Sequence, residues 1–359
     1  MINEIQSNTY AVFFDKSLKA LEDFLETHSY SKIFILTDRN TGEYCLPVLR
    51  KALPTLTNYD LIEIDPGEEN KNIDFCIGIW KMLLDFGADR KSLLLNLGGG
   101  VITDIGGFAA STFKRGIDFI QLPTTLLSQV DASVGGKTGI DMDGVKNIIG
   151  TFTQPKAVFI NSQFLATLDR KQIISGFAEM VKHGLIYDKG YFETLQGVDF
   201  SAIDETYIIR SVEIKNDVVT KDPTEKGLRK ILNFGHTIGH AIESYSLAHD
   251  SFPLLHGEAI AVGMICEAYL SHRLNNLSLN ELNEVTAYIR TLFPAYVFNH
   301  SIDDQLFEYM LNDKKNTDGK IGFALLARIG HCTFDHYVER ALIVEALDYY
   351  RSLELKTYD

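Results

Sequence analysis

The stretch "SLLLNLGGGVITDIGGFAA", residues 92–110, decides the fold class of this chain. An uncharged apolar run leads into three consecutive glycines, and a segment with apolar residues at helical spacing follows. This order is typical of a buried strand, a tight turn and a helix. Because glycine has no side chain, the backbone N–H groups of the turn can approach a phosphate closely. The stretch matches neither G-x-G-x-x-G nor a P-loop, so nucleotide binding and simple strand–helix packing both remain open.

Strands and helices alternate on both sides of this stretch. Residues 31–38, 59–65 and 117–127 are short runs rich in β-forming residues, and residues 72–87 have helical apolar spacing. Such alternation predicts a mostly parallel sheet with helices on both faces. We therefore expect an α/β domain with a Rossmann-like sheet over residues 1–165.

The pattern changes after residue 165. Long segments with apolar residues at helical spacing follow, for example residues 202–222 and 256–274. The next strand signal comes at residues 320–330. We therefore predict an all-α C-terminal domain over residues 166–359. Because no flexible linker separates the halves, we expect them to pack together, with a ligand site in the cleft between the two domains.

The composition limits the classes of function. The 359 residues carry a formal net charge of −14, which disfavours nucleic acid and membranes as partners. Four scattered cysteines without a C-x-x-C pair indicate a reducing, cytoplasmic location rather than a disulfide framework. No signal peptide is evident, and no apolar run is long enough to span a membrane. A phosphate-bearing substrate would require basic residues gathered locally, against the overall sign of the charge.

A second glycine-rich loop, "VDASVGGKTGIDMDGVKN" (residues 130–147), contains Lys137 and Lys146. Lysines beside glycines commonly meet phosphates, whereas exposed loop lysines are often only solvated. Asp104 is similarly ambiguous, because it stands one turn into the helix that follows the first glycine turn. It can bind ribose hydroxyls, or it can simply favour the helix N-terminus.

Candidate metal ligands occur in the helical half. His236 and His240 in "LNFGHTIGHAIESY" (residues 232–245) are four residues apart, so they share one face of a helix and can chelate zinc. Glu179 and His183 have the same spacing, and His256 lies among small residues in "LLHGEA". Spacing alone does not choose between the two pairs.

Six motifs along the chain resemble those of the 3-dehydroquinate synthase family, within the sugar phosphate cyclase superfamily. They are "LGGGVITDIGGFAA", "QLPTTLLSQVDASVGGKTGID", "KNIIGTFTQP", "SGFAEMVKHG", "GLRKILNFGHTIGHAIE" and "HGEAIAVGM". The resemblance implies an NAD-binding α/β domain, a helical metal- and substrate-binding domain, and an active site between them. It also implies a carbon–oxygen lyase of the shikimate pathway, which leads to the aromatic amino acids. Such an enzyme converts 3-deoxy-D-arabino-heptulosonate 7-phosphate into 3-dehydroquinate and phosphate, with catalytic NAD and Zn2+, or Co2+, as cofactors.

The resemblance assigns the metal to Glu179, His236 and His256. Three protein ligands leave positions open for substrate hydroxyls, as in catalytic zinc sites. It also implies that His240 and Glu225 handle protons. His240 would then lie one helical turn from a metal ligand without being one itself.

The remaining site residues carried over from the resemblance fall into three groups. Lys137 and Lys182 are implied as further catalytic residues. The implied substrate-binding residues are Arg115, Asp131, Asn147, Lys215, Arg229, Asn233 and one of Lys314 and Lys315. The implied NAD contacts are Asp38, Asn40, Glu68, Lys71, Gly99, Gly100, Val101, Asp104, Thr124, Thr125, Lys146, Phe164, Leu165 and Thr167.

A homodimer is expected as well, because Arg115 matches a family arginine that reaches the substrate phosphate of the neighbouring subunit. The chain departs from the family pattern at His183, where an aromatic residue is common, and around Lys146. Two other activities are compatible with the same NAD- and metal-binding motifs. One is another sugar phosphate cyclase, such as a 2-epi-5-epi-valiolone or 2-deoxy-scyllo-inosose synthase. The other is a metal-dependent glycerol-type dehydrogenase, which would release NADH.

Overall fold

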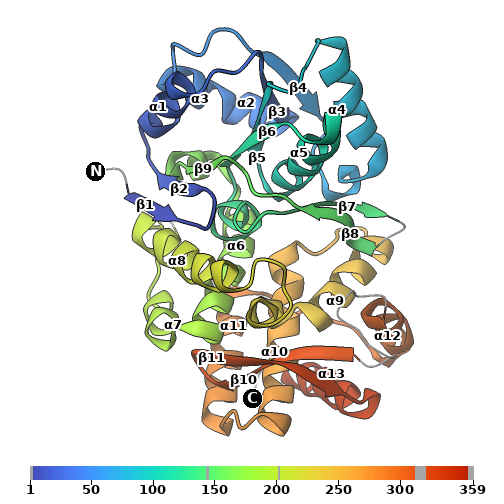
Figure 1. Cartoon of the computed structure of the whole chain (residues 1–359). Helices are drawn as coiled ribbons and strands as arrows, with labels where there is room; N and C mark the ends of the chain where they lie inside the picture. The colour runs from blue at the N-terminus through green and yellow to red at the C-terminus, as the bar shows by residue number, and fades with distance from the viewer. Residues whose placement is uncertain (1–2, 143–144, 201–202, 312–320, 355–359) are drawn as a thin grey trace. The chain divides into compact units, whose positions relative to one another are not determined.

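The computed structural model describes residues 3–142, 145–200, 203–311 and 321–354 (Figure 1). The chain divides into two compact units, residues 1–173 and residues 174–359. Both units bury apolar side chains of their own, such as Phe159 in the first unit and Phe192 in the second.

The first unit is built on a seven-stranded sheet with the strand order β1-β2-β9-β6-β5-β3-β4. Only β1 runs antiparallel to its neighbour, so the sheet is mostly parallel, as predicted. The strands are β1 (Asn3–Gln6), β2 (Ala11–Phe14), β3 (Ile33–Asp38), β4 (Asp60–Ile64), β5 (Leu93–Gly98), β6 (Asp118–Pro123) and β9 (Ala157–Ile160). A separate antiparallel hairpin joins β7 (Lys137–Met142) to β8 (Val145–Phe152).

Strand β5 explains why the opening stretch is apolar at nearly every position. All six of its residues are buried. Leu93, Leu95 and Leu97 belong to one apolar cluster, whereas Leu94 belongs to a second cluster. Successive side chains of a strand point to opposite faces, so the two clusters lie on the two faces of the sheet. A strand covered on both faces is apolar at nearly every position.

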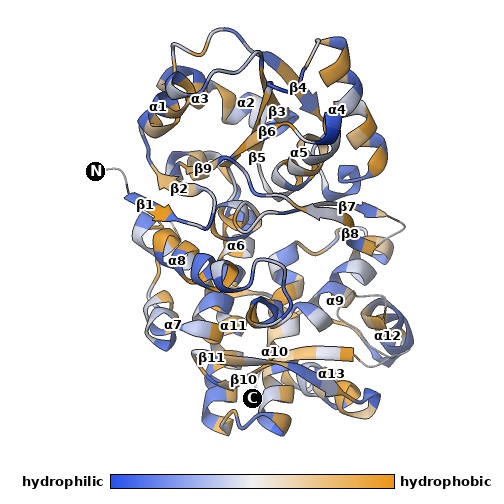
Figure 2. Cartoon of the chain, viewed as in Figure 1, coloured by the Kyte–Doolittle hydropathy of each residue, from blue (hydrophilic) through white to orange (hydrophobic). Residues whose placement is uncertain are grey.

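Helices cover both faces of this sheet (Figure 1). Apolar and polar residues alternate around α4, as Figure 2 shows, and its buried residues Cys76, Ile79 and Leu83 recur at helical spacing. The longer helices of this unit are α1 (Lys19–Thr27), α2 (Arg39–Tyr44), α3 (Leu46–Ala52), α4 (Ile73–Asp85) and α5 (Gly100–Thr112). Short helical turns are η1 (Glu68–Asn70), η2 (Phe113–Arg115), η3 (Ser128–Ala132) and η4 (Ser162–Thr167).

The second unit is predominantly helical, as predicted, with one added antiparallel strand pair, β10 (Ile321–Arg328) and β11 (His331–Val338). Its helices are α6 (Arg170–Tyr187), α7 (Lys189–Leu195), α8 (Glu205–Lys221), α9 (His236–His249), α10 (His256–Leu274), α11 (Leu279–Leu292), α12 (Asp303–Leu311) and α13 (Arg340–Glu354). The turns η5 (Leu228–Asn233) and η6 (His300–Ile302) complete it. Among the described helices, none combines the length and apolarity needed to cross a membrane.

Helices α9 and α10 meet at their backbones. A Cβ atom placed on Gly263 of α10 would lie 1.9 Å from the carbonyl oxygen of Gly235, which precedes α9. Gly235 also has a φ of +80°, a conformation that residues with a side chain rarely adopt. This close approach sets the first residues of the two helices, His236 and His256, near one another.

Candidate active site

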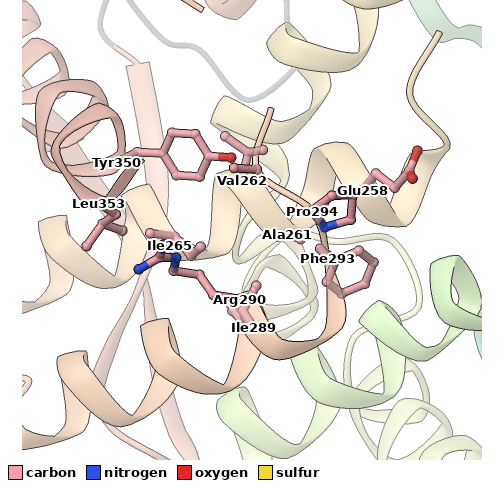
Figure 3. Close-up of a pocket in the computed structure, with 11 residues that line it drawn as sticks. Glu258, Ala261, Val262, Ile265, Ile289, Arg290, Phe293, Pro294, Tyr350 and Leu353 are labelled. Carbon is pink, nitrogen blue, oxygen red and sulfur yellow. The ribbon is translucent and has the colours of Figure 1, made fainter. Parts of the chain in front are cut away.

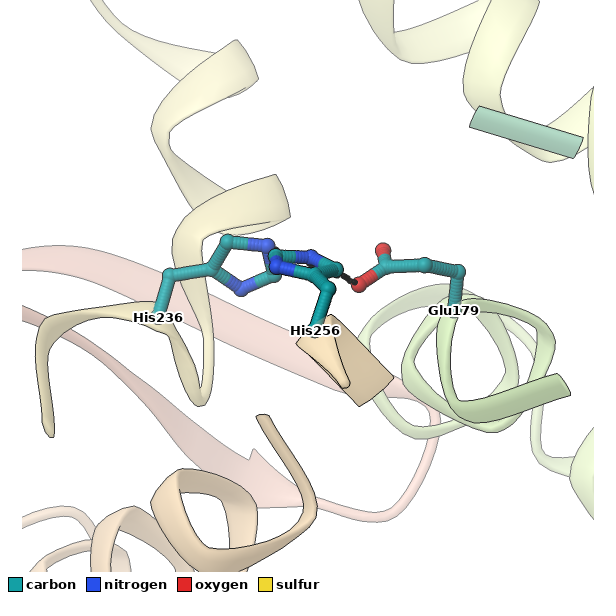
Figure 4. A group of neighbouring side chains, drawn as sticks. All are labelled: Glu179, His236 and His256. Carbon is teal, nitrogen blue, oxygen red and sulfur yellow. Dashed lines mark ion pairs between the residues drawn. The ribbon is translucent and has the colours of Figure 1, made fainter. Parts of the chain in front are cut away.

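Three of the predicted side chains converge in the second unit (Figure 4). Glu179 comes from the middle of α6, whereas His236 and His256 are the first residues of α9 and α10. Each histidine places its Nε2 atom 3.5 Å from the same carboxylate oxygen, Oε1 of Glu179. Two ligands that each lie about 2.1 Å from a tetrahedral zinc ion are roughly 3.4 Å apart. The spacing of these donor atoms therefore fits a single metal ion.

Both imidazole rings are oriented by a contact at their other nitrogen. Nδ1 of His236 lies 3.1 Å from the carbonyl oxygen of Phe234, and Nδ1 of His256 lies 3.2 Å from Oε2 of Glu243. Each acceptor favours a proton on Nδ1. Nε2 therefore faces Glu179, and it can bind a metal ion in place of a proton.

The charges around this cluster favour a cation. Glu179 is fully buried and forms an ion pair with Lys182 through its second oxygen, Oε2. Burial lowers the pKa of His256, but the carboxylates of Glu243 and Glu179 outweigh this and raise that pKa to about 9. The same negative potential would favour a bound metal ion.

His240 lies beside the cluster. Its ring centroid is 5.0 Å from that of His236 and 5.9 Å from that of His256. His240, Glu243 and His256 form a second group whose donor atoms lie within 4.8 Å of one another. We retain Glu179 in the ligand set because both Nε2 atoms face it, while Glu243 contacts the opposite nitrogen of His256.

His183 follows Glu179 by one helical turn on α6 and is fully buried. Its Nδ1 lies 2.7 Å from the hydroxyl of Ser211 on α8. This contact joins two helices of the second unit. It also gives the buried imidazole a polar partner.

Cations that the resemblance assigns to catalysis or to the substrate are buried in the second unit, although the protein is acidic. Lys182, Lys215 and Arg229 are 1%, 5% and 1% exposed. Arg229 donates a hydrogen bond from one guanidinium nitrogen to the carbonyl oxygen of Pro223 at 2.8 Å. Charged side chains are rarely buried unless ion pairs, hydrogen bonds or a bound ligand compensate for their loss of hydration.

The segment before η5 holds Glu225 in an unusual conformation. Its φ is +60°, and its carboxylate accepts a hydrogen bond from the side-chain amide of Asn233 at 2.8 Å. Asp222 holds the same loop by accepting hydrogen bonds from the backbone N–H groups of Gly227 at 2.7 Å and Arg229 at 3.1 Å. Strained residues of this kind concentrate at functional sites, where the surrounding structure maintains them.

In the first unit, predicted NAD contacts follow the carboxyl ends of parallel strands. Asp38 ends β3, and Thr124 and Thr125 follow β6. Gly99 is the N-cap of α5, directly after β5, and a Cβ atom on it would lie 2.9 Å from Cγ2 of Thr125. This edge of an open α/β sheet is where such folds bind ligands.

A buried lysine organises the neighbouring polar residues. Lys71 is 3% exposed, and its Nζ lies 2.9 Å from Glu68, 3.3 Å from Asp104 and 3.6 Å from Asp141. Burial alone would lower the pKa of Lys71, but these carboxylates raise it. Burial raises the pKa of Asp104 to about 6, although Lys71 opposes that change. Lys146 joins the network through an ion pair with Glu68 at 3.0 Å.

The other predicted residues of the first unit are placed as follows. Asn147 accepts a hydrogen bond from Lys71 at 3.0 Å, and Arg115 lines a surface depression with Asp89, Arg90, Thr112 and Lys114. Gly100 and Val101 open α5, whereas Phe164, Leu165 and Thr167 belong to η4. Asn40 and Lys137 are exposed, and Asp131 is half-buried. Lys314 and Lys315 lie outside the described residues.

Comparison with known proteins decides the family. The descriptions "3-dehydroquinate synthase N-terminal" and "3-dehydroquinate synthase C-terminal" match residues 61–175 and 176–316. The chain belongs to the 3-dehydroquinate synthase family. A 3-dehydroquinate synthase of Parabacteroides distasonis is 46% identical over 341 residues, which cover 94% of this chain and 96% of that protein.

Solved structures related to this 3-dehydroquinate synthase family member include two other sugar phosphate cyclases. A 2-deoxy-scyllo-inosose synthase complexed with carbaglucose-6-phosphate, NAD+ and Co2+ aligns with a TM-score of 0.82 and 25% identity, covering 98% of this chain and 99% of that chain. A 2-epi-5-epi-valiolone synthase of Streptomyces hygroscopicus with NAD+ and Zn2+ bound gives the same TM-score, 0.82, and the same identity, 25%, with coverage of 98% and 99%.

The sequence assigned no role to three residues that the structure connects to predicted site residues of this family member. Glu243 contacts His256, Asp141 pairs with Lys71, and Asp222 holds the loop of Glu225. Glu243 lies three residues after His240 on the same helical face, and Asp141 lies within the second glycine-rich loop. Their contacts with His256, Lys71 and the Glu225 loop are not revealed by local spacing.

A separate pocket in the second unit lies between α10, α11 and α13 (Figure 3). Its lining is mainly apolar, with Glu258, Arg290 and Tyr350 as the polar side chains. None of the predicted site residues that the structure describes contributes to this lining. The cluster of Glu179, His236 and His256, rather than this pocket, therefore remains the candidate active site.

Proposed function

We propose that this chain converts 3-deoxy-D-arabino-heptulosonate 7-phosphate into 3-dehydroquinate and phosphate, using bound NAD and a divalent metal. The observation that carries the proposal is the convergence of Glu179, His236 and His256 in a member of the 3-dehydroquinate synthase family. Shape and donor chemistry both support a metal at this cluster. Two imidazoles and one carboxylate form a donor set typical of catalytic zinc.

NAD and the metal are supported by the related cyclases, whose structures contain NAD+ with Co2+ or Zn2+. In this chain, Glu179, His236 and His256 would hold the metal, and the carboxyl edge of the first unit's sheet would hold NAD. When bound, NAD supplies reversible hydride transfer, and the metal supplies a Lewis acid for the substrate's hydroxyl and carbonyl oxygens. We favour Zn2+ over Co2+.

The chain's own residues bind and orient an anionic substrate. Lys182, Lys215 and Arg229 are buried cations, and Arg229 is further fixed by its bond to Pro223. Fixed positive groups in a buried site stabilise phosphate and carboxylate groups more strongly than exposed groups do. We assign Lys215 and Arg229, with Asn233, to substrate binding, and Lys182 to catalysis.

Proton movement is assigned to His240 and Glu225. His240 is close to the two histidine ligands, and Glu225 is held by Asn233. A base must be positioned within hydrogen-bonding reach of the proton it moves. The hydrogen bond between Asn233 and Glu225 supports this role, because it restricts the carboxylate to one orientation.

We further propose a cytoplasmic homodimer. The four cysteines are free thiols, as expected in a reducing compartment. Arg115 lines a surface depression rather than a buried site of its own unit, and it would act on the substrate of a second subunit.

The test is incubation with the heptulosonate phosphate, NAD and Zn2+, with phosphate release measured and the cyclic product identified. We expect phosphate and 3-dehydroquinate in equal amounts, with no build-up of NADH. Steady NADH production without phosphate release would instead indicate the glycerol-type dehydrogenase. Turnover of a different sugar phosphate, with none of the heptulosonate, would indicate another cyclase.

A further inference from the structure

Glu267 is a fully buried carboxylate on α10 that has no role in the proposed reaction. Its Oε2 accepts a hydrogen bond from the backbone N–H of Gly235 at 2.7 Å. Its Oε1 accepts another from the backbone N–H of Ile238 at 3.1 Å. These two N–H groups stand on either side of His236, the first residue of α9. One side chain therefore holds the backbone around a candidate metal ligand.

The start of α9 needs such a partner. The first N–H groups of a helix have no acceptor within the helix, and an N-cap side chain usually satisfies one of them. The N-cap of α9 is Gly235, which has no side chain, and residues 235–239 are buried. Leaving these N–H groups without an acceptor would cost free energy. The Glu267 carboxylate on α10 provides the hydrogen-bond acceptors that no N-cap side chain of α9 provides.

The position of Glu267 on α10 makes this contact specific. Glu267 follows Gly263 by four residues, so both lie on the face of α10 that meets the start of α9. Gly263 lets the backbone of Gly235 approach closely, and Glu267 bonds to the N–H groups that follow. A negative charge is also favourable at the N-terminus of a helix. The two contacts together fix the backbone around His236.

We propose that Glu267 is a positioning residue for the metal centre. By holding Gly235 and Ile238, it sets where Nε2 of His236 lies relative to Glu179. The inference rests on the proposed metal site of Glu179, His236 and His256. Metal–ligand distances lie within about 0.2 Å of their ideal values, so we expect a small movement of the α9 backbone to weaken binding.

The test is the Zn2+ affinity of the metal-free full-length chain, measured by competition with a chromogenic chelator. Glu267→Gln keeps the size of the side chain but removes its charge and one of its two acceptors. We expect Zn2+ affinity to fall by about tenfold or more, the range seen when outer partners of metal ligands are lost. The visible absorption of the Co2+-loaded variant should also change, because it reports ligand geometry.

Glu281→Gln is the matched control. Glu281 also accepts two backbone hydrogen bonds, from Ser278 at 3.1 Å and from Ile329 at 3.0 Å, at the start of α11. Its loss should lower the thermal midpoint while leaving Zn2+ affinity within about twofold of the parent. If lower stability alone reduced Zn2+ affinity, both variants would lose affinity. If Glu267 positions His236, only Glu267→Gln loses affinity.

The proposal is overturned if Glu267→Gln binds Zn2+ as tightly as the parent chain, or if both variants lose affinity equally. If Glu267→Gln does not fold, Glu267→Asp decides by the same criteria, since it keeps the charge but shortens the reach. Failure of the parent chain to bind Zn2+, or unchanged binding in Glu179→Ala, would refute the metal site itself. The two kinds of failure are therefore distinguishable.

Discussion

Oε2 of Glu243 lies 3.2 Å from Nδ1 of His256, at the nitrogen that faces away from Glu179. The Glu243 side chain is almost fully buried, so water does not readily replace it as the partner of the ring. A carboxylate in this position holds a histidine in the orientation and tautomer that a metal ion needs. Because Glu243 contacts Nδ1 of His256, it lies on the opposite side of the ring from Nε2. This position excludes a metal site formed by Glu243, His240 and Nε2 of His256.

Glu243→Ala should therefore weaken Zn2+ binding by about 10- to 100-fold, because the ring of His256 would lose its orienting partner. Chelator competition with the purified variant measures this affinity. Glu284→Ala removes an exposed glutamate that contacts Gln196 and serves as the control. Equal affinities in the two variants would show that Glu243 does not orient a metal ligand.

His236→Ala should abolish Zn2+ binding and activity, since the metal would lose one of three protein ligands. His240→Ala should retain Zn2+ and slow turnover, because we assign His240 to proton handling. Metal analysis of both purified variants, alongside phosphate release, distinguishes the two residues. The opposite result, with metal lost only in His240→Ala, would mean that the ligand set is wrong.

Asp104 provides a pH-dependent prediction. Burial raises its pKa to about 6, so the folded chain retains a proton between about pH 4 and 6 that the unfolded chain has released. Stability therefore falls as the pH rises through this window. Asp104→Asn mimics the protonated form and removes this loss. The free energy of unfolding of Asp104→Asn minus that of the parent should therefore increase by roughly 2 kcal/mol between pH 4.5 and pH 7.5. Urea unfolding at both pH values measures the difference, and a pH-independent difference would contradict the prediction.

Gly263→Ala should destabilise the chain by about 1–3 kcal/mol or more, the usual cost of overpacking. Its Cβ atom would meet the carbonyl oxygen of Gly235 at 1.9 Å, so α9 and α10 would have to separate. Zn2+ affinity should fall with stability. Gly78→Ala in α4 is the matched control, because its Cβ atom would meet nothing within 4 Å.

We expect Gly78→Ala to be neutral or stabilising by up to about 1 kcal/mol, as alanine favours a helix. Thermal unfolding of both variants checks the pair. A stable Gly263→Ala variant with normal Zn2+ affinity would show that the close contact of α9 and α10 is not required.

The mostly parallel sheet was predictable from sequence because each buried strand has its own local signal. Leu93 to Leu97 form an apolar run that a doubly covered strand requires, and the glycines after it mark the turn into α5. The strand pair β10–β11 was only partly foreseen, since residues 320–330 have a strand signal and its partner β11 mixes exposed and buried positions.

The candidate site was harder to predict than the sheet from the local sequence pattern. Helical spacing placed His236 and His240 on one face, but it did not assign their roles. Glu179 lies 57 residues before His236 in sequence, so their proximity depends on how α6 packs against α9 and α10. The resemblance supplied this set, and the structure brings its three side chains together. Asp141 lies within a quoted motif and Glu267 does not, but the contacts of both arise from packing that local spacing does not reveal.

The first residues of α9 and α10 lie close together, and this affects the order in which metal and substrate bind. Both helices begin at a candidate metal ligand, so their N-terminal N–H groups add positive potential there. Glu179, Glu243 and Glu267 offset it, and in the metal-free chain these carboxylates repel an anionic substrate. A divalent cation at this cluster would offset the carboxylates and add to the attraction that the buried cations Lys182, Lys215 and Arg229 exert on anions. We therefore expect metal to bind first and the sugar phosphate, with its phosphate and carboxylate groups, second.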